Sequence, residues 1–220
     1  MSSYSNNIKV VPNYLDEKLW WVSTKRSDAP DSFKKVNDGI IRIGYIGTPT
    51  HNADLKIVVD AIKKIEKIYG NKVQVEVVGG YQNTKPEFGK RVGLPKNNQY
   101  INFVSWIDKR VNWDIGIIPL ADDNFNKNKS YLKFLEYSAL DLAIVCSKGI
   151  TYADVSRHSS NCLVAENTTE SWFNNIEKLI IDADLRVQLA KQAREDLTTS
   201  YTVQRNKVVY EQVFESAKVR

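Results

Sequence analysis

The sequence contains few of the residues that form covalent cross-links or bind metals. Its 220 residues include two cysteines, two histidines and one methionine. Cys146 and Cys162 form no CxxC pair, so we expect buried structural thiols in a reducing compartment rather than a disulfide framework. His51 and His158 stand far apart in the chain, which gives little support to a histidine-based metal site. We therefore expect the protein to bind no metal and no cofactor.

Long apolar stretches and targeting signals are also missing. No apolar run approaches the roughly 18 residues that a transmembrane helix requires, and no secretory signal peptide is evident. We therefore expect a cytoplasmic protein, one that could still lie at the inner face of the cell membrane.

The charge of the chain is mildly basic and is not concentrated in one block. The formal net charge is +5 at pH 7, and it comes from scattered lysines. No stretch interleaves basic and aromatic residues as a groove for single-stranded nucleic acid does, so we expect no nucleic-acid partner. An anionic small ligand and an anionic membrane surface fit this basic excess about equally well.

Regular alternation of apolar runs with helical or long polar connections begins near residue 40. The predicted strands are Ile40–Ile46, Val73–Val78, Tyr100–Trp106, Asp114–Leu120, Leu142–Ser147 and Asn161–Ala165. The predicted helices span residues 54–69, 131–140, 169–182, 183–200 and 203–218. This rhythm predicts an α/β fold: a Rossmann-like, doubly wound parallel sheet of about six strands with helices on both faces and a helical C-terminal tail.

The chain divides into three parts on this basis. Residues 1–39 are an irregular N-terminal segment, residues 40–182 form the Rossmann-like domain, and residues 183–220 are C-terminal helices expected to pack on the same domain. Ligands of such sheets bind beyond the carboxyl ends of the strands. The loops that follow the predicted strands are therefore the place to look for chemistry.

The stretch from Trp113 to Ser147 combines a buried strand, a polar loop, a helix and a second buried strand. Ser130 is a plausible N-cap for the helix, and Lys129, Lys133 and Glu136 share one helical face. A helix start flanked by lysines at the end of a parallel strand suits a phosphate group. A solvated helix with an ordinary ion pair explains the spacing equally well.

Other strand ends offer weaker signals. Gly47, Thr48 and His51 follow the first strand, where they could let a ligand approach the backbone or simply form a strand–helix turn. Gly80 could admit a ligand, although a tight turn is the better explanation. Trp106 could wall a nucleobase pocket, yet a tryptophan at a strand end more often lies in the core. The sequence has no Ser/His/Asp order, metal-ligand cluster or P-loop.

Several of these segments resemble the C-terminal, nucleotide-sugar-binding domain of GT-B glycosyltransferases. They are similar to the large group 1, or family 4, set of retaining enzymes and to the bacterial surface-polysaccharide type among them. The resemblance rests on VVPNYLDEKLW (Val10–Trp20), IGYIGTPTHNADL (Ile43–Leu55), VEVVGG (Val75–Gly80), WDIGIIPL (Trp113–Leu120) and FNKNKSYLKFLEYSALDLAIVCS (Phe125–Ser147). By this resemblance, residues 1–39 derive from the linker that enters the second domain.

The resemblance implies a retaining, hexosyltransferase-type enzyme that moves a sugar from a nucleotide diphosphate sugar to a glycan or lipid-linked acceptor in polysaccharide biosynthesis. Glu136 matches the family's ribose-binding carboxylate. The residues that match the diphosphate-binding region are Gly47, Thr48, His51, Lys129, Ser130, Tyr131 and Lys133. Asn126 and Asn128 fall where the donor sugar binds, and Gly80, Trp106 and Ile107 fall near the nucleobase. The catalytic residue is not identified.

This chain also departs from the family pattern. Asn128 stands where the first Glu of the E-x7-E motif contacts the sugar, and the usual Arg and Lys after the first strand are replaced by Thr48 and His51. The N-terminal acceptor domain is missing, so we expect a fragment or excised domain with little or no transfer activity by itself. The alternative is a non-catalytic nucleotide-binding or assembly module that keeps the GT-B half-fold.

Overall fold

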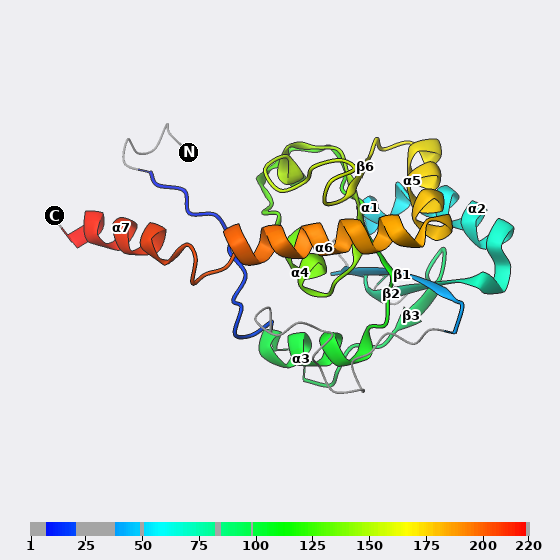
Figure 1. The fold of residues 1–220 in the computed structure, drawn as a ribbon, viewed down its shortest axis with the longest axis horizontal. Helices are drawn as coiled ribbons and strands as arrows, with labels where there is room; N and C mark the ends of the chain where they lie inside the picture. The colour runs from blue at the N-terminus through cyan, green and yellow to red at the C-terminus, as the bar shows by residue number, and fades with distance from the viewer. Residues whose placement is uncertain (1–7, 21–37, 49–50, 82–84, 98, 219–220) are drawn as a thin grey trace.

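The structure is a computed structural model that describes residues 8–20, 38–48, 51–81, 85–97 and 99–218. Its described strands form one sheet in the order β3-β2-β1-β4-β5-β6, and every neighbouring pair is parallel. The strands are β1 (Ile41–Gly47), β2 (Val73–Gly79), β3 (Lys90–Val92), β4 (Ile115–Ile118), β5 (Ala143–Ser147) and β6 (Leu163–Ala165). This order confirms the predicted Rossmann-like, doubly wound sheet (Figure 1).

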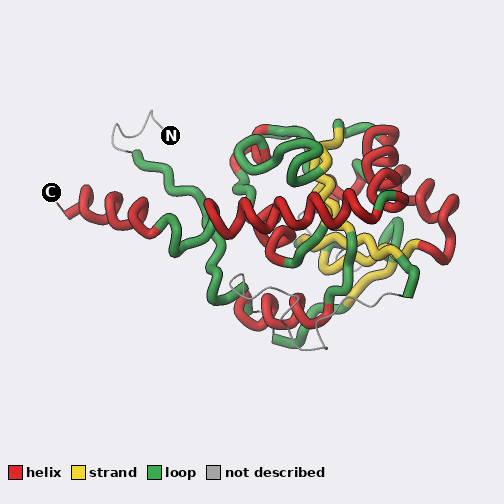
Figure 2. The backbone as a smooth tube through the Cα atoms, viewed as in Figure 1, coloured by secondary structure: helices red, strands yellow, loops and turns green. Residues whose placement is uncertain are grey.

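Helices cover both faces of the sheet, which lies between them in Figure 2. They are α1 (Asn52–Lys56), α2 (Val59–Tyr69), α3 (Tyr100–Arg110), α4 (Leu132–Ala139), α5 (Thr169–Ile181), α6 (Ala183–Ser200) and α7 (Lys207–Lys218). Because both faces are covered, the strands are buried on both sides and read as continuous apolar runs, IGII in β4 and AIVCS in β5. No helix in the described part of the chain has the length and apolar character needed to cross a bilayer.

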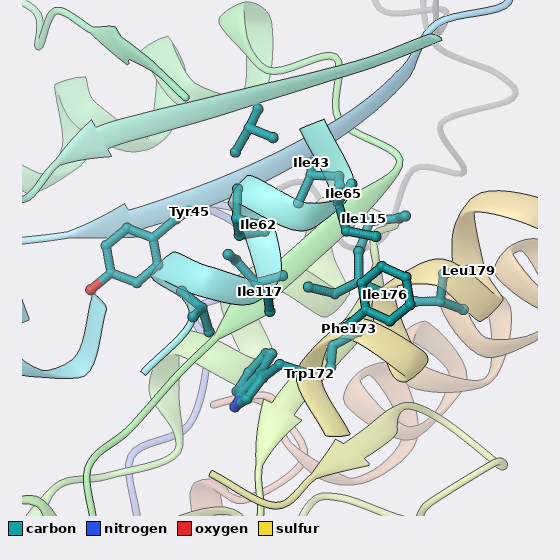
Figure 3. Packing of buried hydrophobic residues seen from close by; sticks show 14 of the residues in the cluster. Ile43, Tyr45, Ile62, Ile65, Ile115, Ile117, Trp172, Phe173, Ile176 and Leu179 are labelled. Carbon is teal, nitrogen blue, oxygen red and sulfur yellow. The ribbon is translucent and has the colours of Figure 1, made fainter. Parts of the chain in front are cut away.

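Two hydrophobic clusters fill the space between the helices and the sheet. On one face, α1, α2 and α5 pack against β1, β2 and β4 around Ile62, Ile115 and Trp172 (Figure 3). On the other face, α3, α4 and the second half of α6 pack together around Ile107 and Phe134. Together these clusters hold the strand ends, and therefore the loops that follow them, in fixed positions.

Strands β1 and β4 are neighbours in the sheet although β2 and β3 lie between them in sequence. The chain therefore runs outward from β1 in one direction and then crosses to the other side to form β4. Adjacent loops at such a switch point diverge to opposite faces of the sheet and leave a crevice between them. The strand order therefore predicts a crevice between the β1–α1 loop and the β4–α4 loop, and we call this region the crevice below.

The prediction of a strand at Tyr100–Trp106 is wrong, because these residues begin α3. The side chains that are buried here, Val104, Ile107 and Val111, are spaced by three and four residues, which is a helical period. Tyr100 and Ile101, in the first turn of the helix, are exposed, although Tyr100 lies four residues before Val104 on the same face. A short apolar run was therefore assigned the wrong period.

The third strand of the sheet is instead β3, inside the segment 81–99 that was predicted to be a loop. Lys90 and Arg91 are exposed and only Val92 is buried. Charged residues on a short edge strand prevent pairing with another chain. Because of them the strand has no apolar run, and so it was not predicted. The count of six strands is thus correct although one of the six was misplaced.

The ends of the chain meet at one side of the domain. Leu15 donates its amide to Tyr201 O at 2.9 Å and accepts from the Val203 amide at 2.9 Å. Helix α6 packs on α4 and β5, whereas α7 extends away from the sheet beside the N-terminal segment (Figure 1). The rings of Tyr14 and Tyr210 lie 6.0 Å apart.

Candidate functional site

The floor of the crevice is formed by the end of β1. Gly47 passes so close to Tyr45 that a Cβ on Gly47 would lie 2.3 Å from the Tyr45 hydroxyl. That hydroxyl is buried and has no hydrogen-bond partner among the described residues. Glycine at position 47 therefore lets the chain cross over Tyr45 and exposes its own backbone at the strand end.

The glycine pair after β2 supports this floor. Gly79 and Gly80 have φ values of +69° and +60°, a region that glycine adopts without strain. The Gly80 amide donates to Gly47 O at 2.7 Å, and a Cβ on Gly79 would meet the same oxygen at 1.9 Å. The pair is thus a tight turn that braces β1, and Gly80 itself is buried.

The start of α4 forms one wall of the crevice. The predicted Ser130 N-cap is wrong, because the helix begins at Leu132 and Tyr131 takes the N-cap position. Ser130 Oγ accepts a hydrogen bond from Asn13 Nδ2 at 2.9 Å instead. The N-cap residue Tyr131 makes no side-chain cap, and no described side chain replaces it. The first amide groups of α4 are therefore available to an anion, and the helix dipole favours negative charge there.

Lys133 and Glu136 project from the first two turns of this helix. Burial lowers the pKa of Lys133 to about 8, although the charge of Glu136 opposes that change. The Lys133 ammonium lies 4.8 Å from the centre of the Tyr45 ring, a cation–π contact that holds it at the end of β1. Burial also raises the pKa of Glu136, against the hydrogen bond from Tyr100 and the charge of Lys133.

Tyr100, at the start of α3, holds one oxygen of Glu136. Its hydroxyl donates to Glu136 Oε1 at 2.9 Å and accepts from Trp20 Nε1 at 3.2 Å. Among the described residues, no hydrogen bond engages the second carboxylate oxygen. This contact was missed from the sequence because the segment was predicted to be a strand rather than a helix.

His51 and Lys129 approach each other across the crevice. His51 Nδ1 lies 2.6 Å from Asp54 Oδ2, and Lys129 Nζ lies 3.8 Å from the same oxygen. The Lys129 ammonium also sits 4.7 Å from the centre of the Phe125 ring. The structure thus brings together Gly47, His51, Lys129, Lys133 and Glu136 from two loops and one helix.

The two asparagines assigned to the donor sugar have different environments. Asn126 is only 3% exposed, and its Nδ2 donates to Asp54 Oδ1 at 2.9 Å and to Ala121 O at 2.9 Å. Its amide nitrogen therefore holds the loop together, while its Oδ1 is buried without a hydrogen-bond partner in the described part of the chain. Asn128 is exposed, and its Nδ2 donates to Asn124 O at 2.6 Å.

The remaining predicted site residues have mixed positions. Trp106 and Ile107 belong to α3 rather than to a strand end, so that part of the prediction is wrong. Ile107 is fully buried in the core, and Trp106 is half-buried against Phe103, with ring centres 5.9 Å apart. The Tyr131 ring packs on Tyr201, with centres 5.8 Å apart. Thr48 is exposed after Gly47.

Comparisons with known proteins agree with this fold. The family model described as "Glycosyl transferases group 1" matches residues 40–182, while curated proteins give no match by sequence. The C-terminal domain of the group 1 glycosyl transferase LpcC from Francisella tularensis superposes with a TM-score of 0.58 at 16% identity, covering 87% of this chain and 95% of that domain.

Longer proteins also contain this fold. HepE from Anabaena, solved with UDP and glucose, matches with a TM-score of 0.68 at 14% identity over 93% of this chain and 56% of its own. WaaG, a glycosyltransferase involved in lipopolysaccharide biosynthesis, matches with a TM-score of 0.63 at 14% identity over 90% of this chain and 54% of its own. The chain thus spans just over half the length of these two proteins, and at such identities the likeness shows the fold alone.

Proposed function

The chain belongs to the group 1 glycosyl transferases, and we propose that it is the donor-binding domain of an enzyme that transfers a sugar from a nucleotide diphosphate sugar. The observation that carries this proposal is the uncapped start of α4, which faces the crevice together with Lys133 and Lys129. HepE, which shares the fold, was solved with UDP and glucose.

The chemistry of the crevice suits a leaving diphosphate. Negative charge develops on the diphosphate as the sugar leaves, and the helix dipole and two ammonium groups stabilise it without any metal. Glu136 keeps one carboxylate oxygen beyond the Tyr100 contact, and a carboxylate accepts well from the adjacent hydroxyls of a ribose. We therefore assign the diphosphate to Gly47, His51, Lys129 and Lys133, and the ribose to Glu136.

The other assignments follow the family resemblance and extend the proposal. The backbone at Thr48, Ser130 and Tyr131 would contribute to the diphosphate site, and the loop that carries Asn126 and Asn128 would border the donor sugar. We propose a retaining, hexosyltransferase-type reaction on a glycan or lipid-linked acceptor in polysaccharide biosynthesis. The lipopolysaccharide role of WaaG and the basic charge of this chain support a location at the inner face of the cell membrane.

A second domain would complete the enzyme. In GT-B enzymes two domains close over the donor, and the other domain binds the acceptor. This chain matches 56% of HepE and 54% of WaaG. We propose that it contributes the donor half of such a cleft and that by itself it transfers sugar at a very low rate.

Calorimetric titration with UDP, GDP and dTDP tests donor binding directly. We expect at least one of them to bind, and Lys133→Ala and Glu136→Ala each to weaken it by about tenfold or more, as expected for a lost charge-assisted contact. Lys127→Ala is the matched control, because Lys127 is on the β4–α4 loop just before the helix but pairs with Asp122 at 3.1 Å. Absence of binding across the panel would contradict the proposal.

One observation favours a second function, a nucleotide-binding or assembly module without transfer activity. Asn128 stands where the family has a sugar-binding Glu, and it is engaged with Asn124 O. Turnover of nucleotide sugars by the full-length protein separates the two functions. Sugar transfer supports the enzyme, whereas nucleotide binding without any transfer supports the module.

A further inference from the structure

Asp54 is a buried carboxylate at the junction of the two loops that border the crevice. It is only 2% exposed and lies in α1, directly after the β1–α1 loop. Its Oδ2 contacts His51 Nδ1 at 2.6 Å, and its Oδ1 accepts from the Ala121 amide at 2.8 Å and from Asn126 Nδ2 at 2.9 Å. One side chain thus joins both sides of the switch point between β1 and β4.

The hydrogen bonds to Asp54 fix the orientation of His51. Although burial raises the pKa of Asp54, the hydrogen bonds from His51 and Ala121 and the charge of Lys129 lower it more, so the carboxyl is ionised at neutral pH. An ionised carboxylate only accepts, so His51 Nδ1 carries the proton in this contact. The opposite ring nitrogen, Nε2, therefore points away from Asp54.

Lys129 depends on the same carboxylate. Because Nδ1 of His51 is already a donor to Asp54, the Lys129 ammonium, 3.3 Å from that nitrogen, cannot donate to it. Its favourable partners are Asp54 Oδ2 at 3.8 Å and the face of Phe125. Both His51 and Lys129, which border the crevice from the two loops, are therefore placed by Asp54.

The charge of Asp54 by itself would weaken the binding of an anion. A negative group beneath a diphosphate repels it, and it also offsets one of the positive charges nearby. Its hydrogen bonds must therefore outweigh its charge if it serves the site. If Asp54 acts only through its charge, removing that charge should strengthen anion binding. If Asp54 positions the loops, removing it should weaken binding.

We propose that Asp54 is a positioning residue for the diphosphate site: it locks the β1–α1 and β4–α4 loops together and orients His51 and Lys129 toward the ligand. The proposal rests on the donor-binding function proposed above. It assigns to this chain a hydrogen-bonded His–Asp pair in place of the Arg and Lys that the family has after the first strand.

The decisive variant is Asp54→Asn, which removes the charge and keeps the size of the side chain. Asparagine offers one acceptor oxygen, so its NH2 group would face His51 Nδ1 or the Ala121 amide, both of which are donors. We expect the affinity for the nucleoside diphosphate that the wild-type chain binds most tightly to fall by about tenfold, the lower range for groups that orient a ligand-binding residue. An affinity that is unchanged or increased overturns the proposal.

Two further variants separate positioning from a general loss of stability. Glu76→Gln is the matched control, since Glu76 is another buried carboxylate (6% exposed) and accepts from Trp113 Nε1 at 2.9 Å within the sheet. We expect it to lower the melting temperature without changing nucleotide affinity. In a His51→Ala background, Asp54→Asn should cost about threefold or less, because one of the groups that it positions is gone; an undiminished loss contradicts the proposal.

Imidazole nitrogen NMR reports the His51–Asp54 contact without any ligand. The chain has only two histidines, and His158 Nδ1 accepts from the Val164 amide at 2.9 Å, so the two rings have opposite Nδ1 roles. We expect protonated Nδ1 on His51 in the wild-type chain and loss of this signature in Asp54→Asn, with the backbone spectrum of the sheet unchanged. An unprotonated Nδ1 in the wild-type chain overturns the proposal.

The nucleotide panel distinguishes failure of this proposal from failure of the proposed function. If the wild-type chain binds none of UDP, GDP and dTDP, donor binding itself is wrong and the role of Asp54 falls with it. If the wild-type chain binds one of them and Asp54→Asn binds it equally well, only the positioning role is wrong.

Discussion

Two charged residues in the crevice, Lys133 and Glu136, have pKa values that burial shifts. Lys133 is held beside Tyr45 in a half-buried position, where its pKa is lowered to about 8. Glu136, one turn later on α4, has a raised pKa for the same reason, burial. Burial strengthens the interaction of each group with a ligand, because charges attract more strongly where water is excluded.

Nucleotide affinity should therefore depend on pH through Lys133. A diphosphate favours the protonated ammonium, so binding raises the pKa of Lys133 and takes up a proton near pH 8. We expect the affinity to fall by about tenfold between pH 7 and pH 9, the change in the protonated fraction of a group with this pKa. Calorimetry in two buffers with different ionisation enthalpies measures both the affinity and the proton uptake.

Lys133→Met provides the control for this pH dependence. The same variant should weaken nucleotide binding but raise the stability of the fold. The folded-state pKa of Lys133 lies below its value in the unfolded chain. The charged ammonium therefore lowers the free energy of unfolding below pH 8, and this loss disappears as the pH rises above 8. We expect the variant to bind weakly at every pH and to have a higher melting temperature than the wild-type chain at pH 7. A wild-type affinity that is flat from pH 7 to 9 contradicts the assignment of Lys133.

Tyr100→Phe should loosen the ribose site. Removing the hydroxyl takes away the hydrogen bond to Glu136 Oε1, which is worth about 1.5 kcal/mol for a charged acceptor, or roughly tenfold in affinity. We expect the variant to lose discrimination between UDP and 2′-deoxy-UDP along with affinity, measured by competitive titration. Equal discrimination in variant and wild-type chain would show that Tyr100 does not orient Glu136.

At the scale of elements, the turns that follow β1 and β2 are more restrictive than the helices around them. Gly79 needs a positive φ and also leaves no room for a Cβ beside Gly47 O. Helix α5, by contrast, begins with an ordinary cap in which Thr168 accepts from the Ser171 amide. The strand ends that form the crevice floor therefore tolerate less change than the surrounding helix termini.

Gly79→Ala should destabilise the crevice floor. The left-handed backbone and the contact with Gly47 O together should cost about 2 kcal/mol or more in the free energy of unfolding, measured by urea denaturation. Gly149→Ala is the control, because Gly149 is extended and a Cβ there would meet nothing within 4 Å. Equal stability of the two variants would contradict this account of the turn.

At the scale of the whole molecule, the two ends of the chain stabilise each other. Leu15 is 1% exposed and Trp20 is 4% exposed, and both belong to the cluster that also contains α4 and the end of α6. The N-terminal segment is thus part of the domain core on this side of the sheet. Through Trp20 and Tyr100 it also reaches Glu136.

Leu15→Ala should therefore lower the free energy of unfolding of the domain. Truncation of a fully buried leucine costs about 2–5 kcal/mol, and we expect a loss in this range in the free energy of unfolding by guanidinium denaturation. Val10→Ala is the matched control in the same segment, since Val10 is 84% exposed. A loss below about 1 kcal/mol for Leu15→Ala would show that the segment is peripheral.

Much of the fold followed from local patterns alone. The apolar runs that became β1, β2, β4, β5 and β6 are short, lie between turns or polar loops and are buried on both faces, and that pattern identifies strands of a parallel sheet without further information. The start of α5 at Thr169 and the span of α6 could also be predicted, because caps and helical periods are properties of neighbouring residues.

The candidate site was predicted only in part. The convergence of the loops that carry His51, Lys129, Lys133 and Glu136 could be predicted, because loops after parallel strands meet at one edge of the sheet; their binding roles stay predictions. The Ser130 cap failed because Asn13, 117 residues away in sequence, engages that hydroxyl. The contact of Tyr100 with Glu136 was missed because a short apolar run fits a strand and a helix equally well until its packing partners are known.

The sequence by itself determined the parallel α/β sheet and the strand ends where a ligand can bind, since both follow from apolar period and chain order. Only the tertiary structure decided how the charged groups at those ends are held. Asp54 joins His51, Ala121 and Asn126 across gaps of three, 67 and 72 residues. Hydrogen bonds of this kind depend on distances in the folded protein, and the longest of them leave no periodic signal in the chain.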